Sequence, residues 1–301
     1  MKKVHFTFCF FALAFVLVAQ NRVQLTHNTD LKSFLNPAFC GSEKALSVSV
    51  LARQQWIGYD NAPSSQILTF DTYLNRLKSG LGITIMTDRL GYENSVRLKV
   101  NYGYRHFVGR NTALSAGLGL GFLNAGFDAS MLVYDEFDPG GIYVSASSYM
   151  PDIDAGIVLS HNRLNLGLSL SKTLDNLQDD IDIEIPFYLN FYTDYSFSFN
   201  DNLIFLPHAY WHKTIKISTI NAGGVFVLSK KLHLGCSYRL KESLNGIFGY
   251  QISKILRLGY SYDFSIGGLK SYHSGSHEVL LKLTLEKKEK EYFYHKSPRF
   301  F

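Results

Sequence analysis

The stretch Val96-Arg97-Leu98-Lys99-Val100-Asn101-Tyr102-Gly103-Tyr104-Arg105-His106 decides the fold of this chain. Apolar or aromatic side chains occupy every second position, and charged, polar or glycine residues stand between them. Successive side chains of a β-strand point to opposite faces of a sheet, so this pattern predicts a strand with one apolar and one polar face. The run matches the ~9–11 residues with which a tilted strand crosses a bilayer, whereas soluble strands average ~5–6 residues.

The same alternation recurs along the chain, most clearly at 164–171, 187–199, 232–241 and 256–265. The predicted strands are 45–56, 65–74, 80–88, 95–106, 112–127, 152–160, 164–171, 187–199, 203–212, 217–228, 232–241, 244–252, 255–265 and 276–286. One such strand would also suit a soluble sandwich, but about fourteen long ones are typical of a membrane barrel. We therefore predict an all-β chain that forms a transmembrane antiparallel β-barrel of about fourteen strands.

The connections between these strands alternate in length. Short turns lie at 75–79, 107–111, 161–163, 200–202, 229–231 and 253–254. Most of the others are longer, namely 57–64, 89–94, 128–151, 172–186 and 266–275, whereas 213–216 and 242–243 are short. Bacterial outer-membrane barrels have short periplasmic turns and longer outer loops, so we predict that both termini are periplasmic. Because hydrocarbon offers no water to an unpaired strand edge, the first and last strands are expected to pair.

The composition agrees with a barrel and disfavours other classes. Charged residues make up 18% of the chain and aromatic residues 15%, with 19 Tyr and 23 Phe. Mean hydropathy is close to zero, which is too polar for a bundle of membrane helices. A polar lumen combined with aromatic girdles accounts for both features. The net charge of +5 forms no single basic stripe, so no nucleic-acid partner is expected.

The N-terminus reads as a signal peptide. Lys2 and Lys3 precede an apolar run at 6–18, which is too short to span a bilayer comfortably as an anchor helix. We therefore divide the chain into a signal peptide at 1–19 that directs Sec export, a periplasmic N-terminal segment at 20–44, an outer-membrane barrel at 45–286 and a periplasmic tail at 287–301. After cleavage only Cys40 and Cys236 remain, and their spacing does not decide whether they pair.

No catalytic or metal-binding pattern stands out. His208 and His212 are four residues apart on a predicted strand, where they lie too far apart to share one ion easily. The glycines at 117–121 alternate within a strand with no helix after them, so a crowded lumen wall explains them better than a dinucleotide loop. Asp135, Glu136 and Asp138 suit a solvated acidic loop better than a calcium site. We predict no cofactor and no enzymatic activity, although a Ser/His or Asp/His pair formed only in space would escape this argument.

Three stretches resemble the PorP/SprF family of type IX secretion system membrane proteins of the Bacteroidota. They are Leu35-Asn36-Pro37-Ala38-Phe39-Cys40-Gly41-Ser42, then Arg53-Gln54-Gln55-Trp56-Ile57-Gly58-Tyr59-Asp60-Asn61-Ala62-Pro63, then Tyr262-Asp263-Phe264 followed by Gly275-Ser276-His277-Glu278-Val279. Cys40 stands where the family pattern has Ala. The motif positions are Asn36, Pro37, Gly41, Arg53, Gln54, Gln55, Trp56, Gly58, Pro63, Gly275, Ser276, His277 and Glu278. The resemblance covers nearly the whole mature chain.

The resemblance implies a non-enzymatic outer-membrane barrel that supports export or surface anchoring of cargo proteins, such as the adhesins of gliding motility. The implied partners are outer-membrane lipid, type IX secretion components, an exported cargo protein and periplasmic motor or peptidoglycan-binding proteins. The alternative is a passive porin or fatty-acid-type channel. In physical terms the motif positions either hold the barrel together or contact a partner. Arg53 faces the lumen if its neighbours face lipid, and it would then reach Glu278 across the closing seam.

Overall fold

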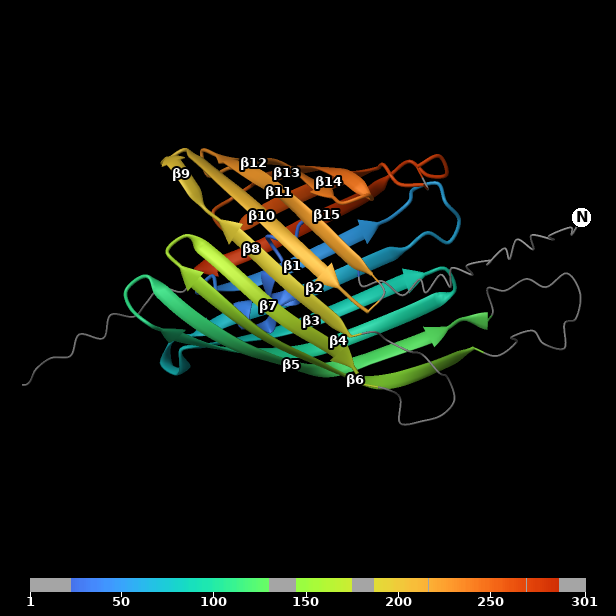
Figure 1. Ribbon diagram of the computed structural model, residues 1–301, viewed down its shortest axis with the longest axis horizontal. Helices are drawn as coiled ribbons and strands as arrows, with labels where there is room; N and C mark the ends of the chain where they lie inside the picture. Colours follow the sequence, from blue (N-terminus) through green and yellow to red (C-terminus); the bar gives the residue numbers. More distant parts are fainter. Residues whose placement is uncertain (1–22, 130–144, 175–186, 216, 269, 287–301) are drawn as a thin grey trace, which may run out of the picture.

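Antiparallel strands close on themselves into a barrel in the computed structural model of the chain (Figure 1). The structure describes residues 23–129, 145–174, 187–215, 217–268 and 270–286. The predicted signal peptide, the tail at 287–301 and the acidic residues Asp135, Glu136 and Asp138 lie outside the described residues. No helix in the described part of the chain is long and apolar enough to cross a membrane.

The wall consists of fourteen passes, because two of the fifteen strands, β8 and β9, are halves of one pass. The strands are β1 (Ala45–Gln54), β2 (Ser64–Leu74), β3 (Ser79–Leu90), β4 (Glu93–Phe107), β5 (Thr112–Phe127), β6 (Ala146–His161), β7 (Leu164–Thr173), β8 (Tyr188–Tyr195), β9 (Phe197–Asn200), β10 (Leu203–Lys213), β11 (Ser218–Leu228), β12 (Leu232–Arg239), β13 (Ser243–Gln251), β14 (Leu256–Ser265) and β15 (Ser276–Glu286). A short 3₁₀ turn, η2 (Asn75–Leu77), connects β2 to β3.

The first and last strands pair, which confirms the predicted closure. β1 pairs with β2 on one side and with β15 on the other, both antiparallel. The register of the seam places Ala45 opposite Glu286 and Arg53 opposite Glu278. Every pass therefore joins one continuous hydrogen-bonded cylinder, as a wall without water on its lipid side requires.

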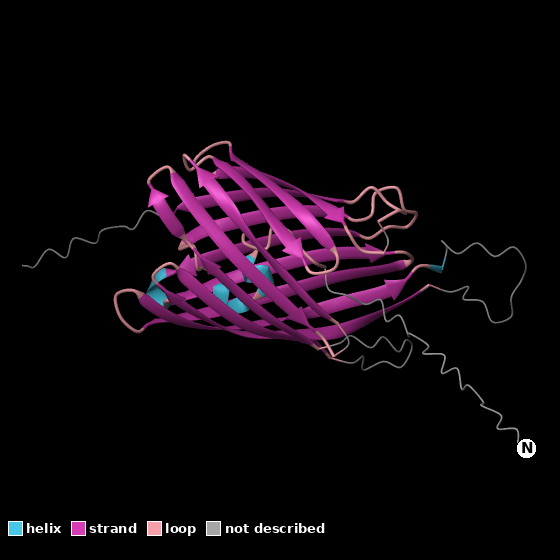
Figure 2. Cartoon of the chain, turned by 45° about the horizontal axis from the view of Figure 1, so that its top comes forward, coloured by secondary structure: helices cyan, strands magenta, loops and turns pink. Residues whose placement is uncertain are grey.

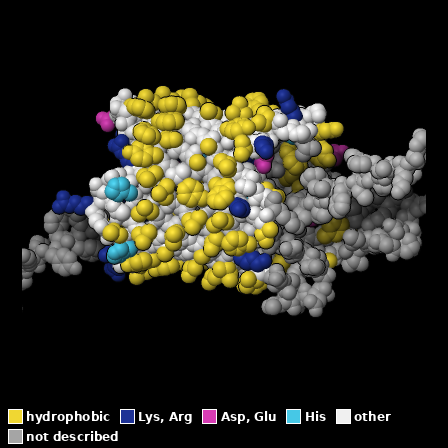
Figure 3. All heavy atoms as spheres, viewed as in Figure 1, with side chains coloured by type: hydrophobic (Ala, Val, Ile, Leu, Met, Phe, Trp, Pro, Cys, Tyr) yellow, Lys and Arg dark blue, Asp and Glu magenta, His cyan; other side chains and the backbone are white. Residues whose placement is uncertain are grey.

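The two faces of the wall separate as the alternation predicts. On β4 the side chains of Val96, Leu98, Val100, Tyr102 and Tyr104 point outward and are between 42% and 54% exposed. Lys99 and Asn101 point inward and are 3% exposed. Figure 3 shows the resulting apolar surface on one side of the barrel.

Most strand boundaries lie within two residues of the predicted ones, but two strands differ more. β6 begins at Ala146 rather than at 152, because its first residues pair with the C-terminal half of β5. The predicted strand 187–199 is interrupted at Ser196, opposite a stretch of β10 that contains Pro207. Pro207 has no N–H to donate to a neighbouring strand, which favours an interruption of the ladder there.

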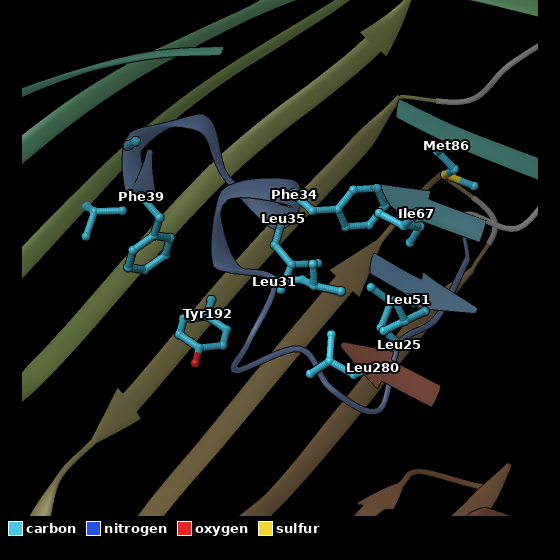
Figure 4. Close-up of a cluster of buried hydrophobic side chains, with 12 residues drawn as sticks. Leu25, Leu31, Phe34, Leu35, Phe39, Leu51, Ile67, Met86, Tyr192 and Leu280 are labelled. Atoms are coloured by element: carbon cyan, nitrogen blue, oxygen red, sulfur yellow. The ribbon is translucent and has the colours of Figure 1, made fainter. Parts of the chain in front are cut away.

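Residues 23–44 fold inside the barrel, and we call this segment the plug. It contains one turn of α-helix, α1 (Lys32–Leu35), and one 3₁₀ turn, η1 (Pro37–Phe39) (Figure 2). The apolar side chains of the plug pack against apolar side chains that the wall points inward (Figure 4). This cluster comprises Leu25, Leu31, Phe34, Leu35, Ala38 and Phe39 from the plug and Leu51, Ile67, Met86, Val158, Tyr192 and Leu280 from the wall.

Candidate functional site

The plug runs through the lumen from one mouth of the barrel to the other. Val23 lines a cavity of about 370 Å³ together with Trp56 and Gly267, at the mouth that carries the longer connections. Lys44 lines another cavity with Asn75 and Glu286, at the mouth that carries the short turns. The plug therefore begins at the mouth with the longer connections, which we call the long-loop mouth, and ends at the mouth with the short turns, which we call the short-turn mouth.

This position differs from the periplasmic segment expected at 20–44. The sequence does carry one signal for it, because Leu25, Leu31, Phe34 and Leu35 lie in a stretch with no strand alternation. Apolar side chains in a segment that neither spans lipid nor stays in water need another surface to bury them. The inward apolar positions of the wall provide that surface.

One attachment of the plug is to Glu278 on β15, whose side chain is 0% exposed. The backbone N–H groups of Thr26 and His27 donate to the Glu278 carboxylate at 3.1 and 2.8 Å. His27 Nδ1 lies 2.7 Å from the same carboxylate. Three contacts between the plug and the last strand therefore depend on one buried side chain.

Glu278 is also part of a buried charge network across the seam. Arg53 Nη1 donates to Glu278 at 3.1 Å, and Arg53 Nη2 donates to Asp263 at 2.6 Å. Arg239 donates to Asp263 at 3.2 Å, and the Thr26 hydroxyl donates to Asp263 at 2.7 Å. The pairing of Arg53 with Glu278 predicted from the sequence is confirmed. Two guanidinium groups balance two carboxylates, which is what buried charges require.

The second attachment is made by Asn36, immediately before η1. Its Oδ1 accepts from the backbone N–H of Ala38 at 2.9 Å and so caps the turn, in which Pro37 occupies the first position. Its Nδ2 donates to the carbonyl oxygens of Ile157 on β6 and Leu168 on β7, at 3.2 and 3.1 Å. One side chain thus shapes the turn and ties it to the wall.

Glycines on the inner face of the wall leave the space that η1 fills. A Cβ added at Gly117 would lie 2.2 Å from the backbone nitrogen of Ala38, and one at Gly80 would lie 2.0 Å from the carbonyl oxygen of Cys40. A Cβ at Gly156 would lie 2.0 Å from Asn36 Oδ1. The crowded lumen wall predicted from the glycines at 117–121 is therefore confirmed, and at Gly117 the crowding comes from the plug.

Near the end of the plug, Gly41 adopts a conformation that favours glycine, with φ +68°, and its N–H donates to Asp71 Oδ1 at 3.1 Å. Cys40 beside it is buried in the lumen, whereas Cys236 is exposed on the outer face of β12. Both cysteines are free, so they do not pair. Burial first, and the nearby Asp71 charge second, raise the pKa of the Cys40 thiol well above its ordinary value.

The remaining motif positions join the long-loop mouth across the seam. The N–H of Gln55 donates to the carbonyl oxygen of Pro63 at 2.9 Å, which closes the loop after β1. The N–H of Trp56 donates to the Ser276 hydroxyl at 3.3 Å, and that of Ile57 donates to the Gly275 carbonyl at 2.9 Å. Trp56, Gly58 and Gly275 all have positive φ values, of +46°, +90° and +95°. Gln54 pairs with His277 in the β1–β15 ladder, and Tyr260 Oη lies 2.7 Å from His277 Nδ1.

Toward the short-turn mouth, ion pairs link the plug to the wall. Asp30 pairs with Arg257, Lys32 with Asp194, and Glu43 with Lys282. Burial raises the pKa of the Asp30 carboxyl, but the charges of Arg257 and Lys282 outweigh it and leave that pKa below its ordinary value. Among the described residues no group of three or more His, Cys, Asp or Glu side chains is placed to hold a metal ion.

Replacing Asn36 with alanine is expected to destabilise the folded barrel by about 1–3 kcal/mol, because the variant loses a cap and two hydrogen bonds that tie the plug to the wall. Urea unfolding followed by tryptophan fluorescence measures the change. Asn111→Ala, in an exposed short turn, is the matched control and should unfold at the wild-type midpoint. Equal midpoints for the two variants would show that Asn36 does not hold η1.

Several solved structures share this barrel architecture. The chain is similar to a FadL homologue from Pseudomonas aeruginosa, with 12% identity, a TM-score of 0.51, and 84% of this chain and 93% of that chain covered. It is also similar to the Ralstonia pickettii toluene transporter TbuX, with 12% identity, a TM-score of 0.51, and 84% of this chain and 92% of that chain covered. A third similar structure is the Pseudomonas putida toluene transporter TodX, with 10% identity, a TM-score of 0.51, and 85% of this chain and 94% of that chain covered. At these identities the likeness establishes the fold of an outer-membrane barrel alone.

No sequence among the curated proteins matches this chain. The family model described as "Type IX secretion system membrane protein PorP/SprF" matches residues 17–283. That range includes the plug, the buried seam network and the motif positions at both mouths. The chain therefore belongs to the PorP/SprF family of type IX secretion system membrane proteins.

Proposed function

We propose that this protein is a non-enzymatic accessory barrel of type IX secretion, which serves as a docking site or anchor for an exported cargo protein such as an adhesin. The observation that carries the proposal is the plug. It occupies the middle of the lumen, packs there in an apolar cluster and attaches to the wall through Glu278 and Asn36. A barrel filled by its own chain suits a role in which other proteins bind at its mouths.

The proposal includes an orientation in the outer membrane. The short turns and the C-terminal end of β15 face the periplasm, and the longer loops face outward, as in other bacterial barrels. Sec export through the signal peptide at 1–19 brings the chain to the periplasm. In this orientation the plug enters the lumen from the outer mouth and leaves it at the periplasmic mouth, where β1 begins at Ala45.

Deletion of the gene is expected to leave at least one cell-surface protein in the periplasm while bulk export continues. Quantitative proteomics of surface-shaved cells and of periplasmic extracts, in wild-type and deletion strains, measures this. Complementation with the wild-type chain should restore the distribution. An unchanged surface proteome in the deletion strain would contradict the docking role.

A passive channel is the second candidate, because solved toluene transporters share the barrel architecture. The plug argues against it. The purified wild-type protein is expected to show no large steady conductance in a planar bilayer, because residues 23–44 fill the lumen between the two mouth cavities. A large steady conductance of the wild-type protein would favour the channel.

A further inference from the structure

The short-turn mouth of the barrel contains a cavity of about 460 Å³ between the plug and the wall. Five cationic side chains line it, namely Lys32, Arg105, Arg163, Arg257 and Lys282. Three carboxylates also line it, from Asp30, Glu43 and Asp194. The cavity therefore contains more positive than negative charge before any ligand enters it.

The three carboxylates are already occupied. Asp30 pairs with Arg257, Asp194 with Lys32, and Glu43 with Lys282. Within the described ranges, no carboxylate lies at ion-pair distance from Arg105 or Arg163. The Nε of Arg105 is enclosed and has no hydrogen-bond partner there. Two guanidinium groups in one cavity thus remain available to an incoming anion.

The rim of the same mouth extends this positive charge. The six short turns carry seven exposed cations, Arg76, Lys78, Arg110, Arg163, Lys230, Lys231 and Lys254, against one acid, Asp201. The described connections at the other mouth carry three acids, Asp60, Asp128 and Glu242, against two cations, Lys241 and Lys270. The charge is therefore concentrated at one end of the barrel, where it attracts anions over several ångströms.

We propose that the short-turn mouth is an acceptor site for an acidic protein segment, whose carboxylates are bound by Arg105 and Arg163. This inference deepens the proposed docking function, because it gives the chemistry of a partner. Guanidinium groups bind planar carboxylates through two parallel hydrogen bonds, which favours them over point charges for such recognition. Arg105 reaches the cavity from the inner face of β4, where membrane lipid does not lie.

The test uses the purified full-length mature protein in detergent and a fluorescein-labelled hexaglutamate peptide, with binding followed by anisotropy. Wild-type protein should bind the peptide, and binding should weaken with added salt. The double variant Arg105→Gln/Arg163→Gln should bind at least about tenfold more weakly. The control Lys241→Gln/Lys270→Gln removes the same charge from the other mouth and should bind as the wild type does.

Folding is checked by the heat-dependent gel mobility of each variant. If the glutamine pair fails to fold, Arg105→Lys/Arg163→Lys replaces it, and this variant should keep the salt dependence but lose affinity. Absence of peptide binding to wild-type protein would overturn the inference, and so would equal weakening by the control pair. If wild-type protein binds phosphatidylglycerol vesicles but not the peptide, and the double glutamine variant does not bind the vesicles, the site binds lipid and the inference is overturned. Loss of a surface protein on gene deletion, without peptide binding, would overturn this inference alone.

Discussion

Replacing Gly117 with alanine is expected to expel η1 from the wall and to open the lumen. The added Cβ would lie 2.2 Å from the nitrogen of Ala38 and 2.4 Å from the carbonyl carbon of Pro37. Both neighbours are backbone atoms and cannot rotate away, so the expected cost lies at or above the about 1–3 kcal/mol typical of overpacking. Urea unfolding measures the loss of stability, and planar-bilayer recording measures the conductance that a displaced plug permits.

Gly246→Ala is the matched control for this variant. Gly246 lies on β13, and a Cβ there meets nothing within 4 Å. Both substitutions reduce the conformational entropy of the unfolded chain by the same amount. The difference between their unfolding free energies therefore reports an effect on the folded state. The control should stay closed and unfold within about 0.5 kcal/mol of the wild type. Identical stability and identical closure in both variants would show that η1 does not lie against Gly117.

Replacing Glu278 with alanine is expected to destabilise the barrel by about 3–5 kcal/mol, because it leaves a buried guanidinium with one partner fewer. The variant also loses the contacts that Thr26 and His27 make with this carboxylate. Plug and seam are therefore weakened together. The thermal unfolding midpoint and the rate of proteolysis at the plug measure the two effects.

Glu286→Ala, at the exposed end of the same strand, is the control and should be neutral within about 0.5 kcal/mol. The double variant Arg53→Met/Glu278→Leu removes both charges of the pair. Its loss of stability should be smaller than the summed losses of Arg53→Met and Glu278→Leu measured singly. Additive losses would mean that the two side chains act independently, contrary to the network described above.

The wall of the barrel is predictable from the sequence because lipid and lumen impose an alternation on each strand. Val96 to Tyr104 shows it most clearly, and the seam partners Arg53 and Glu278 follow from the same reasoning. The boundaries that differ most have local causes. Ala146–Pro151 contains too little alternation to be recognised as a strand, and the predicted strand 187–199 is interrupted opposite the stretch of β10 that contains Pro207.

The plug is not predictable in this way, because its position depends on contacts between residues far apart in the chain. Pro37 is recognisable as part of a turn and Gly117 as a crowded position, but nothing in either pattern shows that they meet. The same holds for Arg105 on β4 and Arg163 in the turn between β6 and β7, which line one cavity only in the closed barrel.

The central claim, that residues 23–44 fill the lumen, is tested most directly by the reactivity of Cys40. Cys40 is 5% exposed, so a charged maleimide has little access to its sulfur. Burial also raises the pKa of the thiol, so little of the reactive thiolate forms. In a Cys236→Ser background, labelling of Cys40 in the folded mature protein should be at least about a hundredfold slower than in the urea-unfolded protein. Labelling at the same rate in both states would contradict a plugged barrel.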